Sequence, residues 1–154
     1  GGGTGGLEDI NVKWTGPTAS LHSYVQRKAA DRDNEWDNFL GLFGRPAMTS
    51  MAFELGGREH QAEMSELFWN KVGPMAHAKK SPSLRTYHLF FDRDDCDSIV
   101  PNGTVNMIRW PTASFKVKYQ EGLLREAIEH HVFCVRWVLW KFKRGVAVPF
   151  YHNK

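Results

Sequence analysis

The spacing of apolar residues predicts helices in the first part of the chain. A turn at residues 16–18 precedes a helix predicted over residues 19–30, because the apolar residues there recur at helical spacing: Leu21, Tyr24, Val25 and Ala29. A second helix is predicted over residues 34–43. It is expected to end before Pro46, since proline disfavours helix in the residue that precedes it.

The hydrophobic period changes after Pro46. Residues 51–55 alternate between large apolar and other side chains, which predicts a short strand closed by Gly56 and Gly57. A third helix is predicted over residues 59–76, with an apolar stripe made of Met64, Leu67, Phe68, Val72 and Met75. That stripe is expected to face the core.

After Pro82 the pattern predicts strands almost to the end of the chain. Their ranges are 84–92, 104–110, 114–119, 130–143 and 146–151. Residues 101–103 predict a hairpin turn, whereas residues 121–128 fit either a helical turn or a continued strand. Helices followed by long antiparallel strands predict an α+β fold, a cone in which a curved sheet wraps round N-terminal helices and encloses a pocket.

Composition narrows the class of protein. The 154 residues suit one domain over residues 7–154, preceded by a flexible linker or cloning scar over residues 1–6. The 20 basic and 17 acidic residues are balanced and scattered, so no nucleic-acid partner is expected. No apolar run long enough for a membrane span and no secretory pattern is present, which predicts a soluble cytoplasmic protein without a membrane partner.

The two cysteines, Cys96 and Cys134, lack the spacing of metal ligands and do not indicate a disulfide framework. Neither a metal site nor a cofactor is expected.

His88 is the strongest candidate for chemistry. In the predicted strand, alternation puts it on one face with Leu84, Thr86 and Phe90. One interpretation is a hydrogen-bonded core histidine. The other is an acid/base group, which requires a nearby carboxylate to orient the imidazole, and Asp31 or Asp33 could supply it.

Several segments resemble the scytalone dehydratases, fungal enzymes with the cone fold of nuclear transport factor two and the polyketide cyclases. The block from Asp31 to Trp36 resembles that family's Asp-x-x-x-x-Trp segment, and Leu84-Arg85-Thr86-Tyr87-His88 resembles its Leu-Arg-Thr-x-His strand. Residues 107–111 and 131–146 resemble its later strands and final hairpin. The resemblance implies that His88 and Asp31 form an acid/base pair.

The chain also departs from the family's pattern. Ala30 stands where the family has a tyrosine, and Thr112 stands where it has a second catalytic histidine. Val132 and Cys134 stand where it has serine and asparagine. Because most donors that would hold a developing enolate are missing, efficient dehydration of scytalone is not expected.

The resemblance therefore implies a cofactor-independent enzyme of fungal-type secondary metabolism, a lyase, isomerase or cyclase. Its substrate would be a small hydrophobic polyketide or terpenoid. Candidate substrate contacts, each equally compatible with ordinary core, are Phe53, Phe68, Trp110, Thr112, Phe115, Val132, Cys134 and Phe150. Alternatives are a shape-templating pericyclase of the Diels-Alderase kind and a non-catalytic cone-fold domain that binds a ligand or partner.

A homo-oligomer, either a dimer or a trimer, is expected as well. The long strand predicted over residues 130–143 places four large apolar residues on one face: Phe133, Val135, Trp137 and Leu139. The opposite face also carries apolar residues, and both faces cannot line one pocket.

Overall fold

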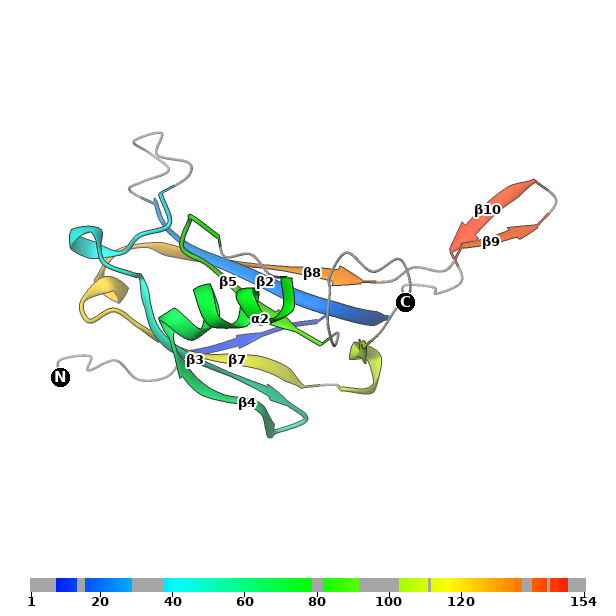
Figure 1. Cartoon of the computed structure of the whole chain (residues 1–154), viewed down its shortest axis with the longest axis horizontal. Coiled ribbons are helices and arrows are strands. Elements are labelled where there is room, and N and C mark those ends of the chain that lie inside the picture. The colour runs from blue at the N-terminus through cyan, green and yellow to red at the C-terminus, as the bar shows by residue number, and fades with distance from the viewer. Residues whose placement is uncertain are drawn as a thin grey trace.

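The chain forms a β-sandwich of two antiparallel sheets in the computed structural model, which describes residues 8–13, 16–28, 38–78, 82–91, 103–110, 112–136, 140–143 and 145–149 (Figure 1). The strands are β1 (Glu8–Asn11), β2 (Pro17–Arg27), β3 (Met48–Leu55), β4 (Arg58–Ser65), β5 (Thr86–Phe90), β6 (Val105–Asn106), β7 (Ala113–Tyr119), β8 (Ile128–Arg136), β9 (Trp140–Lys143) and β10 (Val146–Pro149). The helical segments are η1 (Leu42–Gly44), η2 (Phe68–Val72), α2 (Gly73–Ala78), η3 (Met107–Arg109) and η4 (Leu123–Arg125). No helix among the described residues is long and apolar enough to cross a membrane.

The first sheet has the strand order β1-β7-β3-β4. β3 and β4 form a hairpin whose turn is Gly56 and Gly57, with positive φ angles of 59° and 76°. Glycine adopts such angles without the steric cost that a Cβ atom would bring. β7 pairs with the other edge of β3, so that Phe53 lies opposite Phe115.

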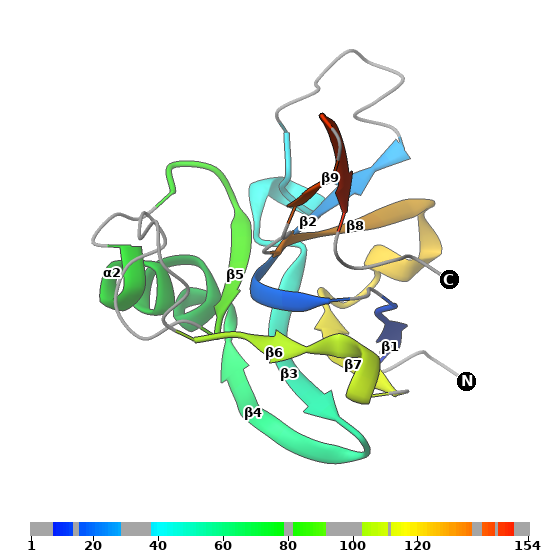
Figure 2. The same cartoon turned by 90° about the vertical axis from the view of Figure 1, so that its right-hand side faces the viewer.

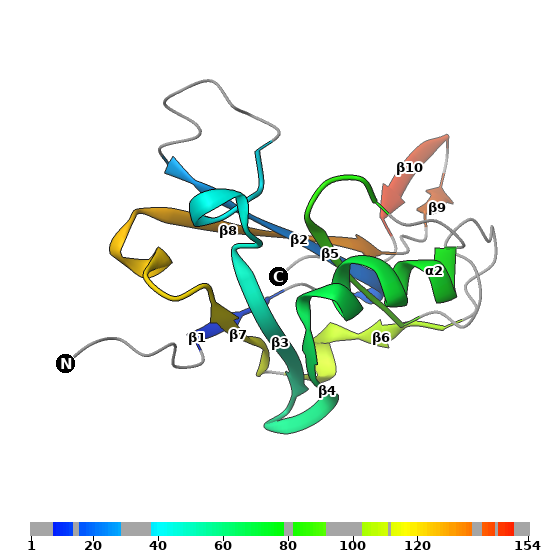
Figure 3. The same ribbon diagram turned by 60° about the vertical axis from the view of Figure 1, so that its left-hand side comes forward.

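The second sheet is built on β2. Residues Ser20 to Tyr24 pair with β5 on one edge and with β8 on the other, and β6 pairs with the start of β2 at Pro17 and Thr18. Figure 3 shows β2 and β8 running side by side over most of their length. The β9–β10 hairpin forms a separate two-stranded sheet and is drawn apart from the sandwich in Figure 1.

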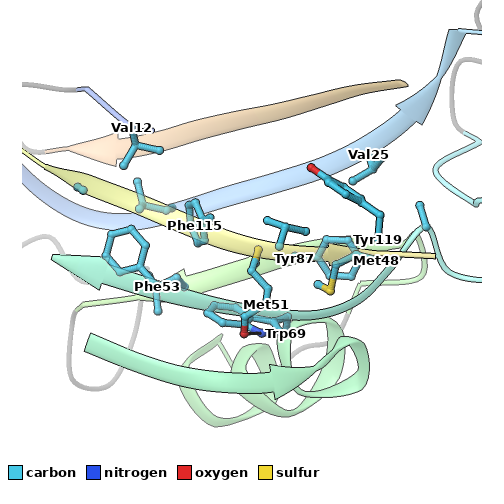
Figure 4. Close-up of a cluster of buried hydrophobic side chains, with 14 of the residues drawn as sticks. Val12, Val25, Met48, Met51, Phe53, Trp69, Tyr87, Phe115 and Tyr119 are labelled. Atoms are coloured by element: carbon cyan, nitrogen blue, oxygen red, sulfur yellow. Dashed lines mark hydrogen bonds between the residues drawn. The ribbon is translucent and has the colours of Figure 1, made fainter. Parts of the chain in front are cut away.

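The hydrophobic core lies between the two sheets. Alternate side chains of β3 and β7 meet alternate side chains of β2 and β5 there, as Figure 4 shows for Met51 and Phe115 of the first sheet and Val25 and Tyr87 of the second. The rings of Phe53 and Phe115 are 4.8 Å apart between centroids. Large interlocking side chains therefore fill the space between the layers.

The helical segment η2 follows β4 and continues into α2, so that the two lie between β4 of one sheet and β5 of the other along the chain and at one side of the sandwich (Figure 2). Its buried Trp69 donates a ring N–H hydrogen bond to the carbonyl of Met51 at 2.9 Å. Its buried Asn70 donates to the carbonyls of Leu84 and Thr86, at 3.0 and 2.8 Å. One turn thus ties the two sheets together.

The predicted N-terminal helices are wrong. Residues 17–27 form strand β2, because Ala19, Leu21, Ser23 and Val25 are buried at the two-residue period of a strand. In the second predicted helix, residues 34–37 lie outside the described residues, and only the short η1 is helical in the remainder.

The third predicted helix is wrong over its first half. Residues 58–65 form strand β4, which pairs with β3 along the hairpin. The predicted stripe also fails as a core face, because Leu67, Val72 and Met75 are exposed by 56%, 52% and 53%. The buried residues of η2 are Trp69 and Asn70, and the hydrogen bonds of their side chains hold this face of the segment against the sandwich.

The strand predictions are largely confirmed. Residues 51–55 lie in β3, residues 114–119 in β7, and β5 lies within the range 84–92, of which Asp92 is outside the described residues. The range 130–143 contains two strands, β8 and β9, and residues 104–110 contain only the short β6 before η3. Residues 121–128 contain both η4 and the first residue of β8. The predicted hairpin turn at 101–103 begins outside the described residues, and β5 and β6 both pair with β2 instead of with each other.

The α+β cone is also wrong. Because β2 is a strand at the centre of a sheet, no N-terminal helix fills a curved sheet in the described part of the chain. Two sheets pack face to face instead.

Replacing Phe53 by alanine tests the packing of the core. Phe53 is 0% exposed, so Phe53→Ala should lower the free energy of unfolding by about 3–5 kcal/mol through lost burial and the cavity left behind. Urea denaturation followed by circular dichroism measures the loss. Phe43, which is 93% exposed, provides the matched control, and Phe43→Ala should change stability by less than about 0.5 kcal/mol. Equal effects of the two substitutions would contradict this account of the core.

Candidate functional site

His88 lies on the outer face of the second sheet. Within β5, Tyr87 and Leu89 point into the core, and His88 is half-buried with Thr86 and Phe90 on the opposite face. The predicted alternation of faces is confirmed. The core, however, lies behind the other face.

The contacts of η2 fix the start of β5 and so hold His88 in place. Asn70 donates to backbone carbonyls on both sides of Arg85, and the Arg85 guanidinium lies 3.3 Å from the carboxylate of Glu66. Burial, and next the charge of Glu66, raises the pKa of the Tyr87 hydroxyl, which therefore stays protonated. In the segment that resembles a catalytic strand, the residues before His88 thus make contacts that stabilise the fold.

His88 faces a second histidine across the sheet. His22 of β2 lies directly opposite it in the register, and their Nδ1 atoms are 2.6 Å apart. The Nε2 atom of His22 is 2.8 Å from the hydroxyl of Ser20, and the Nε2 atom of His88 is 2.9 Å from the hydroxyl of Thr86. The four side chains form one hydrogen-bonded chain across two strands, which we call the histidine pair and its hydroxyls.

The surroundings of His88 favour its neutral imidazole. Burial, and next the proximity of His22, lowers the pKa of His88 to about 4. A neutral imidazole donates through one nitrogen and accepts through the other. In the link between the two Nδ1 atoms, one ring therefore donates and the other accepts.

Aromatic and apolar side chains extend this outer face onto β8. Tyr24 stacks on His131 with ring centroids 4.9 Å apart, and on Phe133 with centroids 5.9 Å apart. Phe133 and Val135 are 54% and 52% exposed. We call Tyr24, His131, Phe133 and Val135 the β8 outer surface.

A third half-buried histidine lies on the inner side of β8. His130 Nδ1 is 2.7 Å from the hydroxyl of Tyr119. Burial, and next the proximity of His131, lowers the pKa of His130 to about 4, and burial raises the pKa of Tyr119. Both groups are therefore neutral near pH 7 and hydrogen-bond at the margin of the core.

The other predicted site residues are scattered over the sandwich. Phe53 and Phe115 are core residues that contact each other, and Phe68, Val132 and Cys134 are half-buried and pack against that core. These five residues lie on four elements: β3, β7, η2 and β8.

Trp110 and Thr112 are exposed beside the β3–β4 turn. A Cβ atom at Gly56 would lie 2.9 Å from the Trp110 ring, and the backbone N–H of Gly56 donates to the carbonyl of Thr112. Asp31 and Phe150 lie outside the described residues, so the pairing of His88 with Asp31 stays a prediction.

The sequence interpretation missed His22. The signal that would have found it is the pairing of β2 with β5, two segments 66 residues apart at this point. The sequence pattern predicts a helix for the residues of β2, and a helix would not pair with β5. Among the described residues, no group of three or more histidine, cysteine, aspartate or glutamate side chains is placed to hold a metal ion.

Comparisons with known proteins identify the fold. No protein-family model matches the chain, and no curated protein sequence is significantly similar to it. The structure is similar to VP54 of the virus PBCV-1, fitted into a reconstruction of the virophage Sputnik, with a TM-score of 0.79 and 14% identity over 99% of this chain and 47% of that chain. It is also similar to the Faustovirus major capsid protein, with a TM-score of 0.69 and 8% identity over 84% of this chain and 31% of that chain. For the major capsid protein of bacteriophage PM2 the TM-score is 0.53 and the identity 10%, over 87% of this chain and 45% of that chain.

These similarities correct the assignment made from sequence motifs. The two packed sheets have the jelly-roll type of fold found in viral capsid proteins, so the resemblance to scytalone dehydratases is wrong. The predicted lyase, isomerase or cyclase of secondary metabolism is wrong with it. The pericyclase and the cone-fold binding domain are likewise unsupported. The chain spans less than half the length of each of these capsid proteins.

The depressed pKa of His130 predicts a loss of stability in acid. The unfolded chain binds a proton at this histidine near its ordinary pKa of 6.5, whereas the folded chain does so only near pH 4. Stability is therefore constant above about pH 6.5 and falls as the pH drops from there towards 4, by roughly 1–3 kcal/mol for this group. Urea denaturation at pH about 7.5 and about 4.5 measures the loss.

The variant His130→Gln should show a smaller loss between the two pH values, because the titrating group is gone. His131→Gln, at the neighbouring position on the outer face, is the control and should keep most of the loss, because burial is the larger cause of the low pKa of His130 and the proximity of His131 is the smaller one. An identical loss in all three proteins would contradict the role given to His130.

Proposed function

We propose that this chain is a structural module of a protein shell, which assembles with further copies of itself. The observation that carries the proposal is the likeness to VP54 of PBCV-1, with a TM-score of 0.79 over 99% of this chain. The quasi-atomic model of the PBCV-1 capsid and the Faustovirus major capsid protein have the same fold. The role concerns assembly, and no catalytic step is part of it.

The packing of the sandwich supports this role. Phe53, Trp69, Tyr87 and Phe115 fill the space between the sheets, and the Trp69 hydrogen bond closes one side. An interior filled by aromatic rings gives a stiff body, because packed side chains resist deformation. A shell is built from such bodies joined through their outer surfaces.

The β8 outer surface supports contact between copies. Phe133 and Val135 point outward at 54% and 52% exposure, in a cross-strand cluster with the half-buried Tyr24. Exposed apolar patches with polar neighbours are typical of protein–protein interfaces, in which aromatic residues contribute most of the affinity. Both residues belong to the face that the sequence pattern predicts for oligomerisation.

The apolar side chains of the η2–α2 segment offer a second surface. Leu67, Val72 and Met75 are each more than half exposed. A subunit with two different contact surfaces can form rings and larger closed assemblies, because a head-to-tail contact repeats until it closes.

The mass of the protein in solution tests the proposal. We expect multi-angle light scattering to show oligomers, with their population increasing with protein concentration. The double variant Phe133→Ser with Val135→Thr should weaken self-association by about tenfold or more in dissociation constant, because two exposed apolar contacts are lost. Phe43→Ser removes a still more exposed ring elsewhere, at 93% exposure, and should leave association unchanged. A protein that stays monomeric at the highest accessible concentrations would overturn the proposal.

A further inference from the structure

The geometry of the histidine pair points to a binding site for a metal ion. We propose that His22 and His88 bind one divalent transition-metal ion of the kind that imidazole prefers, Zn²⁺ or Cu²⁺, through their Nδ1 atoms. The site lies on the outer face of one sheet and takes both ligands from a single chain, so it does not depend on whether copies assemble.

The two Nδ1 atoms face each other across the sheet. Neighbouring strands hold His22 and His88 in direct register, and the Nδ1 atoms are 2.6 Å apart. Two nitrogen ligands at the usual 2.0–2.1 Å from a tetrahedral zinc ion are ~3.3 Å apart. Binding therefore requires the two rings to turn apart by roughly 0.7 Å at Nδ1.

The hydroxyls supply the second requirement of a histidine metal site. A ligating imidazole usually donates its other N–H to an oxygen atom, which fixes the ring and its tautomer. Here the Nε2 atom of His22 is 2.8 Å from Ser20 Oγ, and the Nε2 atom of His88 is 2.9 Å from Thr86 Oγ1. These contacts hold both rings with the Nδ1 atoms facing each other.

The chemistry of the donors selects the ion. Imidazole nitrogen favours Zn²⁺ and Cu²⁺, whereas Mg²⁺ and Ca²⁺ prefer oxygen ligands. No group of three metal-binding side chains exists among the described residues, and the proposed site takes two protein ligands. The ring of Phe90, with centroids 5.9 Å from His22 and 6.3 Å from His88, shields one side of the site.

Calorimetric titration of the full chain with Zn²⁺ and, separately, Cu²⁺ at neutral pH tests the site. We expect one ion per chain for the unmodified protein and for His131→Ala, which removes a histidine of the same face outside the pair. His22→Ala and His88→Ala should each weaken binding by about tenfold or more, with folding checked by circular dichroism. Unchanged binding in both pair variants, or loss of binding in His131→Ala alone, would overturn the proposal.

A measurement on the unmodified protein avoids any effect of substitution on folding. Substoichiometric Cu²⁺ should broaden the imidazole NMR signals of His22 and His88 before those of His131 and His60. Broadening that spares the pair would refute the site. Thr86→Val, which keeps the side-chain shape and removes the hydroxyl, should weaken binding roughly 10–100-fold at unchanged stoichiometry if the hydroxyl orients His88.

Discussion

The pairing of β2 on both of its edges is the interaction on which the rest of the structure depends. β8 follows β2 from Arg27 to Thr18, and β5 pairs with residues 20–24 from the other side. Inward-facing Leu21 and Val25 then contact the first sheet, and outward-facing His22 meets His88. A strand paired on both edges satisfies its backbone polar groups within the sheet. Of its small buried polar residues, Ser20 has its hydroxyl 2.8 Å from His22 Nε2, whereas the Ser23 hydroxyl has no hydrogen-bond partner among the described residues. Without β2, the core would lose one wall, and His88 on β5 would lose its partner His22.

The sequence predicted local strands well and the position of β2 poorly. In β3 and β7 the two-residue alternation is carried by large residues, Phe53 and Phe115 among them, so the period is visible in the sequence. In β2 the inward positions include Ala19 and Ser23, and apolar residues at 21, 24 and 25 imitate a helical face. Burial of small and polar residues in β2 follows from pairing with segments more than sixty residues away. Such non-local pairing cannot be recognised in a window of a dozen residues.

For the candidate site, the sequence specified the neighbours of His88 but not the face it occupies. Alternation placed Thr86 and Phe90 beside His88, as the structure has them. Which face of β5 is buried depends on the opposite sheet, and Tyr87 and Leu89 face it. The partner of His88 depends on the cross-strand register, which only the folded sheet defines.

The segment Leu84 to His88 shows how a short motif can suggest chemistry that the fold does not support. The carbonyls of Leu84 and Thr86 accept hydrogen bonds from Asn70, Arg85 pairs with Glu66, and Tyr87 fills the core. Each of these contacts anchors the start of β5 to η2, which joins the two sheets. The same residues that resemble a catalytic strand are therefore accounted for by the assembly of the sandwich. His88 makes none of these contacts with η2 and instead pairs with His22 across the sheet. Because aromatic side chains fill the interior, binding takes place on the outer faces of the sheets. On the outer face of the second sheet, the hydrogen-bonded pair of His22 and His88 lies beside the stacked rings of Tyr24 and Phe133.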